Sequence, residues 1–220
     1  MEIYRTERKL LASDVDVSRR LRLSTLFTML QEASIAHTEA LGAGRDKTLD
    51  RGILWVLTLQ NLRITRLPEY DERVTLESWP GQMMHLLFPR YYRMTDERGN
   101  LLLQGSALWV LMDEQTRETV SPQEVGVFVP GTPMAGQPPF PRAPRSMPTH
   151  SVGWCTVSYS ATDLNGHMNN ARYTDLVMDL MPREATALPV AAVDVEYCGE
   201  AKMGDALEIG GGREDRDFFF

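Results

Sequence analysis

The chain has 220 residues, enough for one large domain or two small ones with cores of their own. Its hydrophobic content of 43% and charged content of 24% are typical of a folded globular protein. A net charge of −7 argues against bulk binding of nucleic acid or anionic membranes, which requires a broad basic surface. The longest apolar runs, such as Ala107–Met112, are too short for a membrane span.

The N-terminus has mixed charge and no apolar segment, so it does not resemble a secretory signal. The two cysteines, Cys155 and Cys198, are too few for a disulfide framework and fit a reducing compartment. We therefore expect a cytoplasmic protein.

The first part of the chain predicts one long helix followed by strands. Residues of Ser24–Leu41 are apolar at three- and four-residue spacing, and Gly42 supplies a stop. The segments rich in β-formers that follow are Leu54–Thr65, Arg73–Trp79, His85–Thr95 and Leu101–Met112. A turn at Pro68–Asp71 separates the first two strands, and the last two predict a hairpin.

A proline-rich segment, residues 130–148, then holds seven of the 13 prolines. Such a segment cannot form a helix or a central strand, and it favours an extended, semi-rigid linker. It divides the chain into a first unit, residues 1–129, and a second unit, residues 149–220.

The second unit repeats the order of the first. A segment around Asp163 precedes a predicted helix at Asn170–Leu180, as a similar segment around Asp14, 149 residues earlier, precedes the first helix. Predicted strands follow at Ala191–Cys198 and Ala206–Gly210. Each unit is thus expected to be an α+β layer, a long helix packed on an antiparallel sheet.

The first unit continues for two strands whose counterparts the second unit lacks. The chain instead stops at Phe218-Phe219-Phe220, which fits the start of a strand better than a solvated end. We therefore expect the chain to be a fragment that lacks about two strands of its second unit.

The segment Asp163–Tyr173 carries most of the chemical information. If it is extended, residues i, i+2 and i+4 point to one side, which would put Asp163, Asn165 and His167 on one face. Asn169 or Asn170 can cap the following helix, whose free N–H groups favour negative charge. The segment thus predicts a carboxylate, an amide and an imidazole at a helix start.

This stretch resembles the acyl-ACP thioesterases of plants and bacteria, which have Asp-x-Asn-x-His-x-Asn-Asn followed by a helix with a Tyr. The resemblance continues at Val195–Glu200, where the family has Leu-Glu-Tyr, two variable residues and its catalytic Glu. It reaches the first unit at Leu54–Leu57, Glu77–Pro80 and Ser106–Asp113. The resemblance implies a tandem hotdog fold and hydrolysis of the fatty acyl thioester on acyl carrier protein, which ends fatty-acid elongation. Carried over by position, it makes Asp163, Asn165, His167 and Glu200 the catalytic residues.

Some plant members have a Cys directly after that Glu, but here the position is Ala201. This departure favours water activated by a carboxylate over a cysteine nucleophile. Glu200 would be the general base, with Asp163 as the rival for that role or for direct attack, and Asn165 would orient the water or a carboxylate. His167 would protonate the leaving thiolate.

Backbone N–H groups at the helix start would stabilise the oxyanion. The residues that supply them would be Met168, Asn169 and Asn170. No metal or other cofactor is expected, because His and carboxylates do not recur at zinc-ligand spacing.

Structural roles compete with several of these assignments. Asp163 could simply form an Asx-turn, and Asn169 could be only a helix cap. Glu196 is expected to be structural, and His37 is expected to be a core or pocket-lining histidine.

The first unit has Asp14, Asp16 and Ser18 at places matching the motif, and Leu67 opposite Glu200, so it could not perform the same chemistry. We expect it to bind the acyl chain instead. The predicted pocket residues are Leu26, Met29, Leu30, Ala33, Trp55, Leu57, Met83 and Met84.

The expected partner is acyl carrier protein carrying a fatty acyl-phosphopantetheine, and a homodimer is left open. Two alternatives are an acyl-CoA thioesterase of the same fold and a non-catalytic acyl-binding hotdog module. A hotdog dehydratase would need a different disposition of His and Asp.

Overall fold

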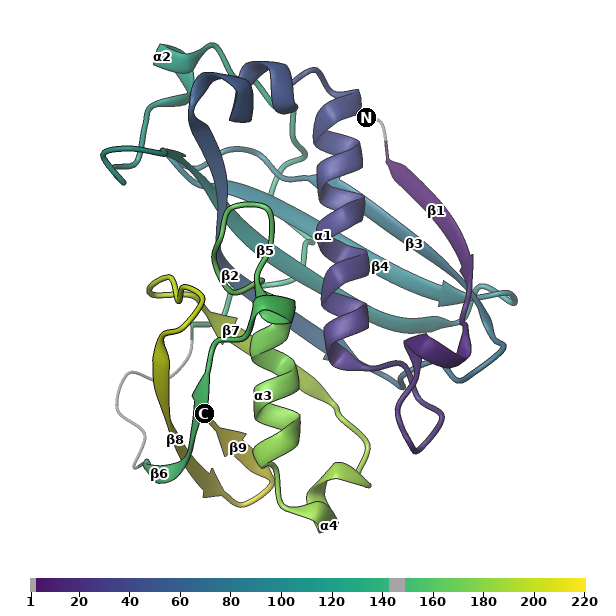
Figure 1. The fold of residues 1–220 in the computed structure, drawn as a ribbon. Helices are drawn as coiled ribbons and strands as arrows, with labels where there is room; N and C mark the ends of the chain where they lie inside the picture. Colours follow the sequence, from purple (N-terminus) through teal and green to yellow (C-terminus); the bar gives the residue numbers. More distant parts are fainter. Residues whose placement is uncertain (1–2, 143–148) are drawn as a thin grey trace. The chain divides into compact units, whose positions relative to one another are not determined.

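The computed structural model describes residues 3–142 and 149–220 (Figure 1). Its longer helices are α1 (Leu23–Ala40) and α3 (Arg172–Leu180), and its short helices are α2 (Pro122–Val125) and α4 (Arg183–Thr186). Its strands are β1 (Tyr4–Lys9), β2 (Ile53–Ile64), β3 (Arg73–Pro80), β4 (Phe88–Asp96), β5 (Leu101–Asp113), β6 (His150–Thr156), β7 (Ala192–Glu196), β8 (Ala206–Glu214) and β9 (Asp217–Phe219). Short 3₁₀ turns occupy 12–14, 45–47, 49–51 and 159–161. Among the described residues, no helix combines the length and apolarity that a membrane crossing requires.

The chain forms two compact units. Unit 1 comprises Met1–Arg142 together with Pro189–Tyr197, and unit 2 comprises Ala143–Leu188 together with Cys198–Phe220. The sequence predicted that each unit is one continuous segment, residues 1–129 and residues 149–220. In the structure, the chain instead enters unit 1 a second time before it completes unit 2. The predicted roles of the two units stay proposals.

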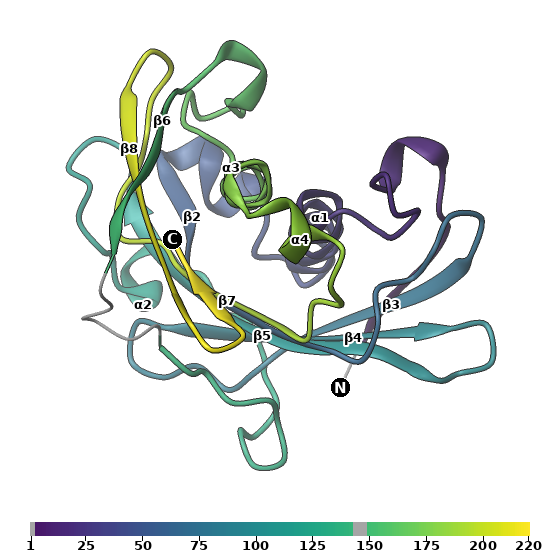
Figure 2. The same cartoon turned by 90° about the horizontal axis from the view of Figure 1, so that it is seen from below.

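Unit 1 is a six-stranded antiparallel sheet in the order β1-β3-β4-β5-β2-β7 with α1 on one face (Figure 2). The predicted helix and four of these strands are confirmed to within about three residues. The α1 residues Leu26, Leu30 and Ala33 are at most 3% exposed, because their spacing turns one helix face toward the sheet. His37 lies one turn further along the same face and is 1% exposed, as expected of a core histidine.

The start of the proline-rich segment covers the other face of this sheet. Tyr92 bonds to Ser34 of α1 at 2.7 Å, so its neighbour Tyr91 points to the opposite face, where it meets Phe140. Ser106 Oγ donates to the Pro139 carbonyl at 2.7 Å. Residues 130–142 are therefore part of unit 1, whereas the sequence predicted an extended linker over residues 130–148. Residues 143–148 lie outside the described residues.

The predicted strand at Ala191–Cys198 exists as β7, but it belongs to unit 1. It pairs with β2, with Leu59 opposite Glu196 and Arg63 opposite Ala192. The sequence predicted its conformation correctly and its sheet wrongly. Glu196 has a structural role here, since Arg142 contacts its carboxylate at 3.2 Å.

Unit 2 has a three-stranded sheet, β6-β8-β9, together with α3 (Figure 1). β8 confirms the strand predicted at Ala206–Gly210, and β9 forms where the terminal aromatic residues predicted a strand. Unit 2 has a small apolar cluster of Val157, Met168 and Ala201, against which Tyr173 and Leu176 of α3 pack. This cluster lies directly beside the residues of the predicted catalytic motif.

Candidate active site

The motif residues 162–168 form a tight hairpin. Asp163 N–H donates to the His167 carbonyl at 2.9 Å, and Gly166 N–H donates back to the Asp163 carbonyl at 3.0 Å. Gly166 has a φ of 76°, a left-handed conformation that favours glycine. The segment is therefore not extended, and the prediction that alternation places three side chains on one face is wrong in its mechanism.

The hairpin ties Asp163 to Asn165 directly. The Asn165 N–H donates to the Asp163 carboxylate at 2.9 Å, which is the Asx-turn expected as the structural role of Asp163. Asp163 is half-buried, whereas Asn165 is exposed. The two residues thus share one turn, with the Asp163 carboxylate already engaged by a backbone donor.

A second segment brings Glu200 to the hairpin. Met168 N–H donates to the Ala201 carbonyl at 2.7 Å, and His167 forms an antiparallel bridge with Lys202. The His167 Nε2 and Glu200 Oε2 atoms are 3.5 Å apart, and the two side chains are 19% and 34% exposed. Two residues that are 33 positions apart in the sequence therefore form a carboxylate–imidazole pair that water can reach.

The helix start differs from the prediction. α3 begins at Arg172, and Asn169 Oδ1 accepts the Ala171 N–H at 3.0 Å, so Asn169 stabilises the turn that leads into the helix. The N–H groups of Met168 and Asn169 already donate to the carbonyls of Ala201 and Ala161. These two groups are not the oxyanion donors that the sequence predicted, and that role stays a prediction for Asn170 alone.

Unit 1 contains the same hairpin 147 residues earlier, not 149 as the sequence suggested. Asp16 N–H donates to the Arg20 carbonyl at 2.8 Å, and Ser18 N–H donates to the Asp16 carboxylate at 2.7 Å. These bonds match those of the catalytic motif, so Asp16 corresponds to Asp163. Arg20 therefore stands where unit 2 has its histidine.

The neighbouring segment repeats as well. The hydrogen bond from Met168 N–H to the Ala201 carbonyl has a counterpart in unit 1, where Leu21 N–H donates to the Pro68 carbonyl at 2.8 Å. The residue before Pro68 is Leu67, which thus occupies the place of Glu200. The predicted correspondence of Leu67 with Glu200 is confirmed, and unit 1 lacks both members of the carboxylate–imidazole pair.

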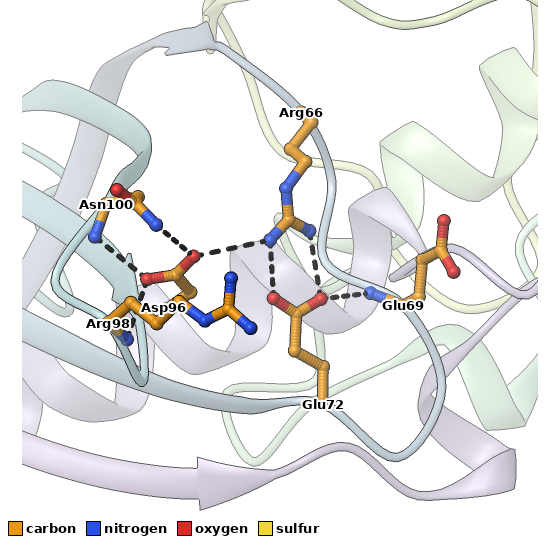
Figure 3. Close-up of polar contacts among 6 residues, drawn as sticks. All are labelled: Arg66, Glu69, Glu72, Asp96, Arg98 and Asn100. Atoms are coloured by element: carbon orange, nitrogen blue, oxygen red, sulfur yellow. Dashed lines mark hydrogen bonds and ion pairs between the residues drawn. The ribbon is translucent and has the colours of Figure 1, made fainter.

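An ion-pair network stabilises this part of unit 1 instead (Figure 3). Arg66 donates to both carboxylate oxygens of Glu72, at 2.9 and 2.6 Å, and lies 3.7 Å from Asp96. Glu69 N–H also donates to Glu72 at 2.9 Å. The segment that would carry a catalytic group is therefore fixed by structural charges in unit 1.

The predicted acyl-binding residues fall into two groups within unit 1. One group is buried on α1 and β2; it consists of Leu26, Met29, Leu30, Ala33 and Leu57. The other lies near a second apolar cluster, where Trp55 packs edge-on against Phe88 at 4.8 Å and Met83 is half-buried. Met83 also lines a hollow of about 270 Å³ beside α2, while Met84 lies in the turn that joins β3 to β4.

A larger hollow of about 850 Å³ also lies in unit 1, and its lining is mainly charged. Its wall includes Arg5, Glu77 and Arg93 on the sheet face opposite α1. It contains none of the predicted acyl-binding residues. In residues 3–142 and 149–220, no cluster of three or more His, Cys, Asp or Glu could hold a metal ion.

Comparison with known proteins identifies the class of fold and then the family. The fold closely matches a protein from Lactobacillus plantarum described as an oleoyl thioesterase, with a TM-score of 0.85, 26% identity, and coverage of 96% of this chain and 84% of that one. The 12:0-ACP thioesterase of Umbellularia californica gives a TM-score of 0.80 at 19% identity, over 97% and 88% of the two chains. The architecture is thus a tandem hotdog fold.

The N-terminal domain of the acyl-ACP thioesterases matches residues 1–125, and their C-terminal domain matches residues 149–216. The chain belongs to the acyl-ACP thioesterase family. The acyl-[acyl-carrier-protein] hydrolase FATB3 of Cuphea viscosissima, a chloroplastic protein, is 22% identical over 210 residues, which are 89% of this chain and 51% of the relative. The chain spans about half the length of such plant relatives.

Proposed function

We propose that this protein hydrolyses fatty acyl thioesters of acyl carrier protein and so releases free fatty acid at the end of elongation. The observation that carries the proposal is the 3.5 Å contact between His167 and Glu200, because it supplies a base and an acid in a solvent-reachable place. Membership of the acyl-ACP thioesterase family supports the choice of substrate.

In the proposed reaction, Glu200 accepts a proton from water while the water oxygen attacks the thioester carbonyl. The tetrahedral intermediate then collapses, the C–S bond breaks, and the thiolate leaves with a proton delivered through His167. Glu200 is proposed as the base instead of Asp163, because its carboxylate contacts His167, whereas one oxygen of the Asp163 carboxylate accepts the Asn165 N–H. Asn165, exposed at the hairpin tip, is proposed to orient the water.

Substituting Glu200→Gln tests the role of the base. We expect kcat to fall by roughly 10²–10⁴-fold, the usual contribution of a positioned general base. Glu208→Gln, which alters an exposed carboxylate on β8 of the same unit, is the matched control and should leave kcat unchanged. Hydrolysis at the wild-type rate by Glu200→Gln would instead support the non-catalytic acyl-binding module.

The substrate is tested by steady-state hydrolysis of acyl-ACP and acyl-CoA that carry the same acyl chain. We expect a higher kcat/KM for acyl-ACP. A preference for acyl-CoA would contradict the proposed substrate while leaving the thioesterase chemistry intact.

The proposal assigns the acyl chain to unit 1, along α1. Met29 is one of the residues that would line this region, and it is 7% exposed. Replacing Met29 by Trp should shift the preference toward shorter chains, because the larger ring fills the space at that turn. An unchanged profile over a panel of acyl-ACPs would exclude this location.

The cellular setting and assembly belong to the same proposal. Cys155 and Cys198 are both free thiols, which supports a reducing cytoplasmic setting. A homodimer is tested by light scattering of the purified protein.

A further inference from the structure

Tyr173 connects the first turn of α3 to the segment that carries Glu200. It packs against the buried cluster of Val157, Met168 and Ala201. The Ala201 N–H donates a hydrogen bond to the phenol oxygen, and burial is the larger influence, raising the pKa of Tyr173 above its ordinary value. The phenol is therefore neutral at physiological pH.

This hydrogen bond acts on the peptide group next to the candidate base, because the Ala201 N–H belongs to the peptide bond that follows Glu200. The Ala201 carbonyl is held as well, by Met168 N–H at 2.7 Å. Glu200 itself is 34% exposed at its side chain, so packing alone does not fix its carboxylate. The backbone contacts on Ala201 therefore act on the residue next to this carboxylate.

Unit 1 shows that the hydrogen bond is not required by the fold. The offset of 147 residues that aligns the two hairpins places Leu26 at the position of Tyr173, and Pro68 corresponds to Ala201. Leucine has no hydroxyl to accept a bond, and proline has no N–H to donate one. Both partners are thus absent from the unit that also lacks the carboxylate, and both are present in the unit that has it.

We propose that Tyr173 is a positioning residue, whose phenol holds the Glu200–Ala201 peptide so that the Glu200 carboxylate stays beside His167. The inference deepens the proposed function and rests on it for the identity of the reaction. Tyr173 would not touch the substrate, but act through Glu200.

Tyr173→Phe removes only the hydroxyl and keeps the ring in its apolar cluster. We expect kcat on acyl-ACP to fall by roughly 10-fold, a part of the contribution of a positioned base, with KM unchanged. Tyr159→Phe, which alters a tyrosine of the same unit that is 83% exposed, is the matched control and should match the wild type. An unchanged kcat in Tyr173→Phe would overturn the proposal.

Ala201→Pro removes the donor of the same hydrogen bond. Pro68 at the equivalent place in unit 1 indicates that this backbone accommodates proline. If both substitutions act through one bond, the double variant Tyr173→Phe/Ala201→Pro should be no slower than the slower single variant. Fold-losses in kcat that multiply in the double variant would show independent effects and overturn the proposal.

A measurement without substrate separates this proposal from the proposed function. The titration of His167 is followed by NMR in the wild type, Glu200→Gln and Tyr173→Phe. The carboxylate favours the charged imidazole, so we expect the midpoint to drop in Glu200→Gln and to move the same way in Tyr173→Phe. Asp163 and Lys202, the other charged residues of the two paired segments, are unchanged in all three proteins.

A wild-type midpoint in Tyr173→Phe would contradict the positioning role, whatever the substrate. A protein that does not hydrolyse acyl-ACP but shows the shift would contradict only the proposed function.

Discussion

At the scale of single residues, Arg90 is a charge buried in the core of unit 1, between β4 and α1. Its guanidinium donates to Thr38 Oγ1 at 2.8 Å and to Ser78 Oγ at 3.1 Å, and it lies 3.3 Å from His37 Nδ1. None of these three partners is a carboxylate, and burial lowers the pKa of Arg90 from its ordinary value. Arg90 therefore joins the helix to two strands through hydrogen bonds.

Arg90→Ala should destabilise the protein by about 3–5 kcal/mol, since it leaves a cavity and removes the donor from the buried Ser78 hydroxyl and the half-buried Thr38 hydroxyl. Arg90→Met keeps most of the volume and removes the buried charge, so it should cost less than the alanine variant. Urea unfolding followed by circular dichroism measures both. Equal stability of the wild type and Arg90→Ala would show that the network does not stabilise the core.

The sequence predicted the candidate residues better than it predicted their geometry. Glu200 and His167 were named from a motif, and the structure brings them together. The predicted oxyanion role was wrong for the N–H groups of Met168 and Asn169, because these groups donate to carbonyls of other segments. Nothing near Met168 in the sequence indicates that its N–H bonds to Ala201. Tyr173 belongs to the motif, but its hydrogen bond comes from the same distant segment, so the motif alone did not predict it.

At the scale of elements, the network around Glu72 couples the turn before β3 to the end of β4 (Figure 3). The hydrogen bond from Arg66 lowers the pKa of Glu72, with burial acting in the opposite direction. Asp96 also has a lowered pKa, chiefly because Asn100 donates to it. A carboxylate with a lowered pKa in the folded state stabilises the protein above its unfolded pKa, and the stabilisation is lost as the pH falls through the folded value.

Glu72→Gln should therefore be less stable than the wild type at pH 7. This difference in stability should disappear below about pH 4, a pH near and under the ordinary pKa of a glutamate. Unfolding by urea at several pH values measures the difference. Glu69→Gln is the comparison variant and should show a smaller difference, because its carboxylate points away from Arg66 in Figure 3 and its charge is the weakest influence on the Arg66 pKa. A difference that stays constant down to pH 3 would exclude the ion pair as its cause.

The elements themselves show where local patterns suffice. α1 and β2 to β5 were predicted because burial on one face leaves a periodic apolar pattern. β1 was missed because Tyr4–Lys9 is an edge strand with mostly charged residues, held to β3 by pairs such as Arg5 with Glu77. β6 was missed for a similar reason, since most of its residues are exposed or half-exposed.

At the scale of the whole molecule, the chain interleaves its two units. It leaves unit 1 after Arg142, returns for Pro189–Tyr197, and then completes unit 2. This order was not predictable from the local pattern, because β7 has the alternation of any half-buried strand. Side chains far away in the sequence determine which sheet β7 joins. Asp194 of β7 accepts hydrogen bonds from Asn61 Nδ2 at 2.7 Å and from Arg63 at 2.6 Å.

The same contacts give the test of the interleaved fold. Asp194→Arg removes the acceptor, leaves Asn61 without this partner and places two positive charges side by side, so β7 should detach from β2. Hydrogen exchange should then speed up at the β2 amides that pair with β7, between Leu59 and Arg63. Asp194→Asn keeps one acceptor oxygen and should show a smaller change.

β2 pairs with β5 along its other edge, which provides an internal reference in the same spectra. Exchange that rises equally at the β2 amides facing β5 would indicate general unfolding instead of loss of β7. Faster exchange only at the β2 amides that face β7 would establish that β7 completes the sheet of unit 1, although the chain before and after it belongs to unit 2. Because Glu200 follows β7 by four residues, such detachment should also lower kcat without any change in the catalytic side chains.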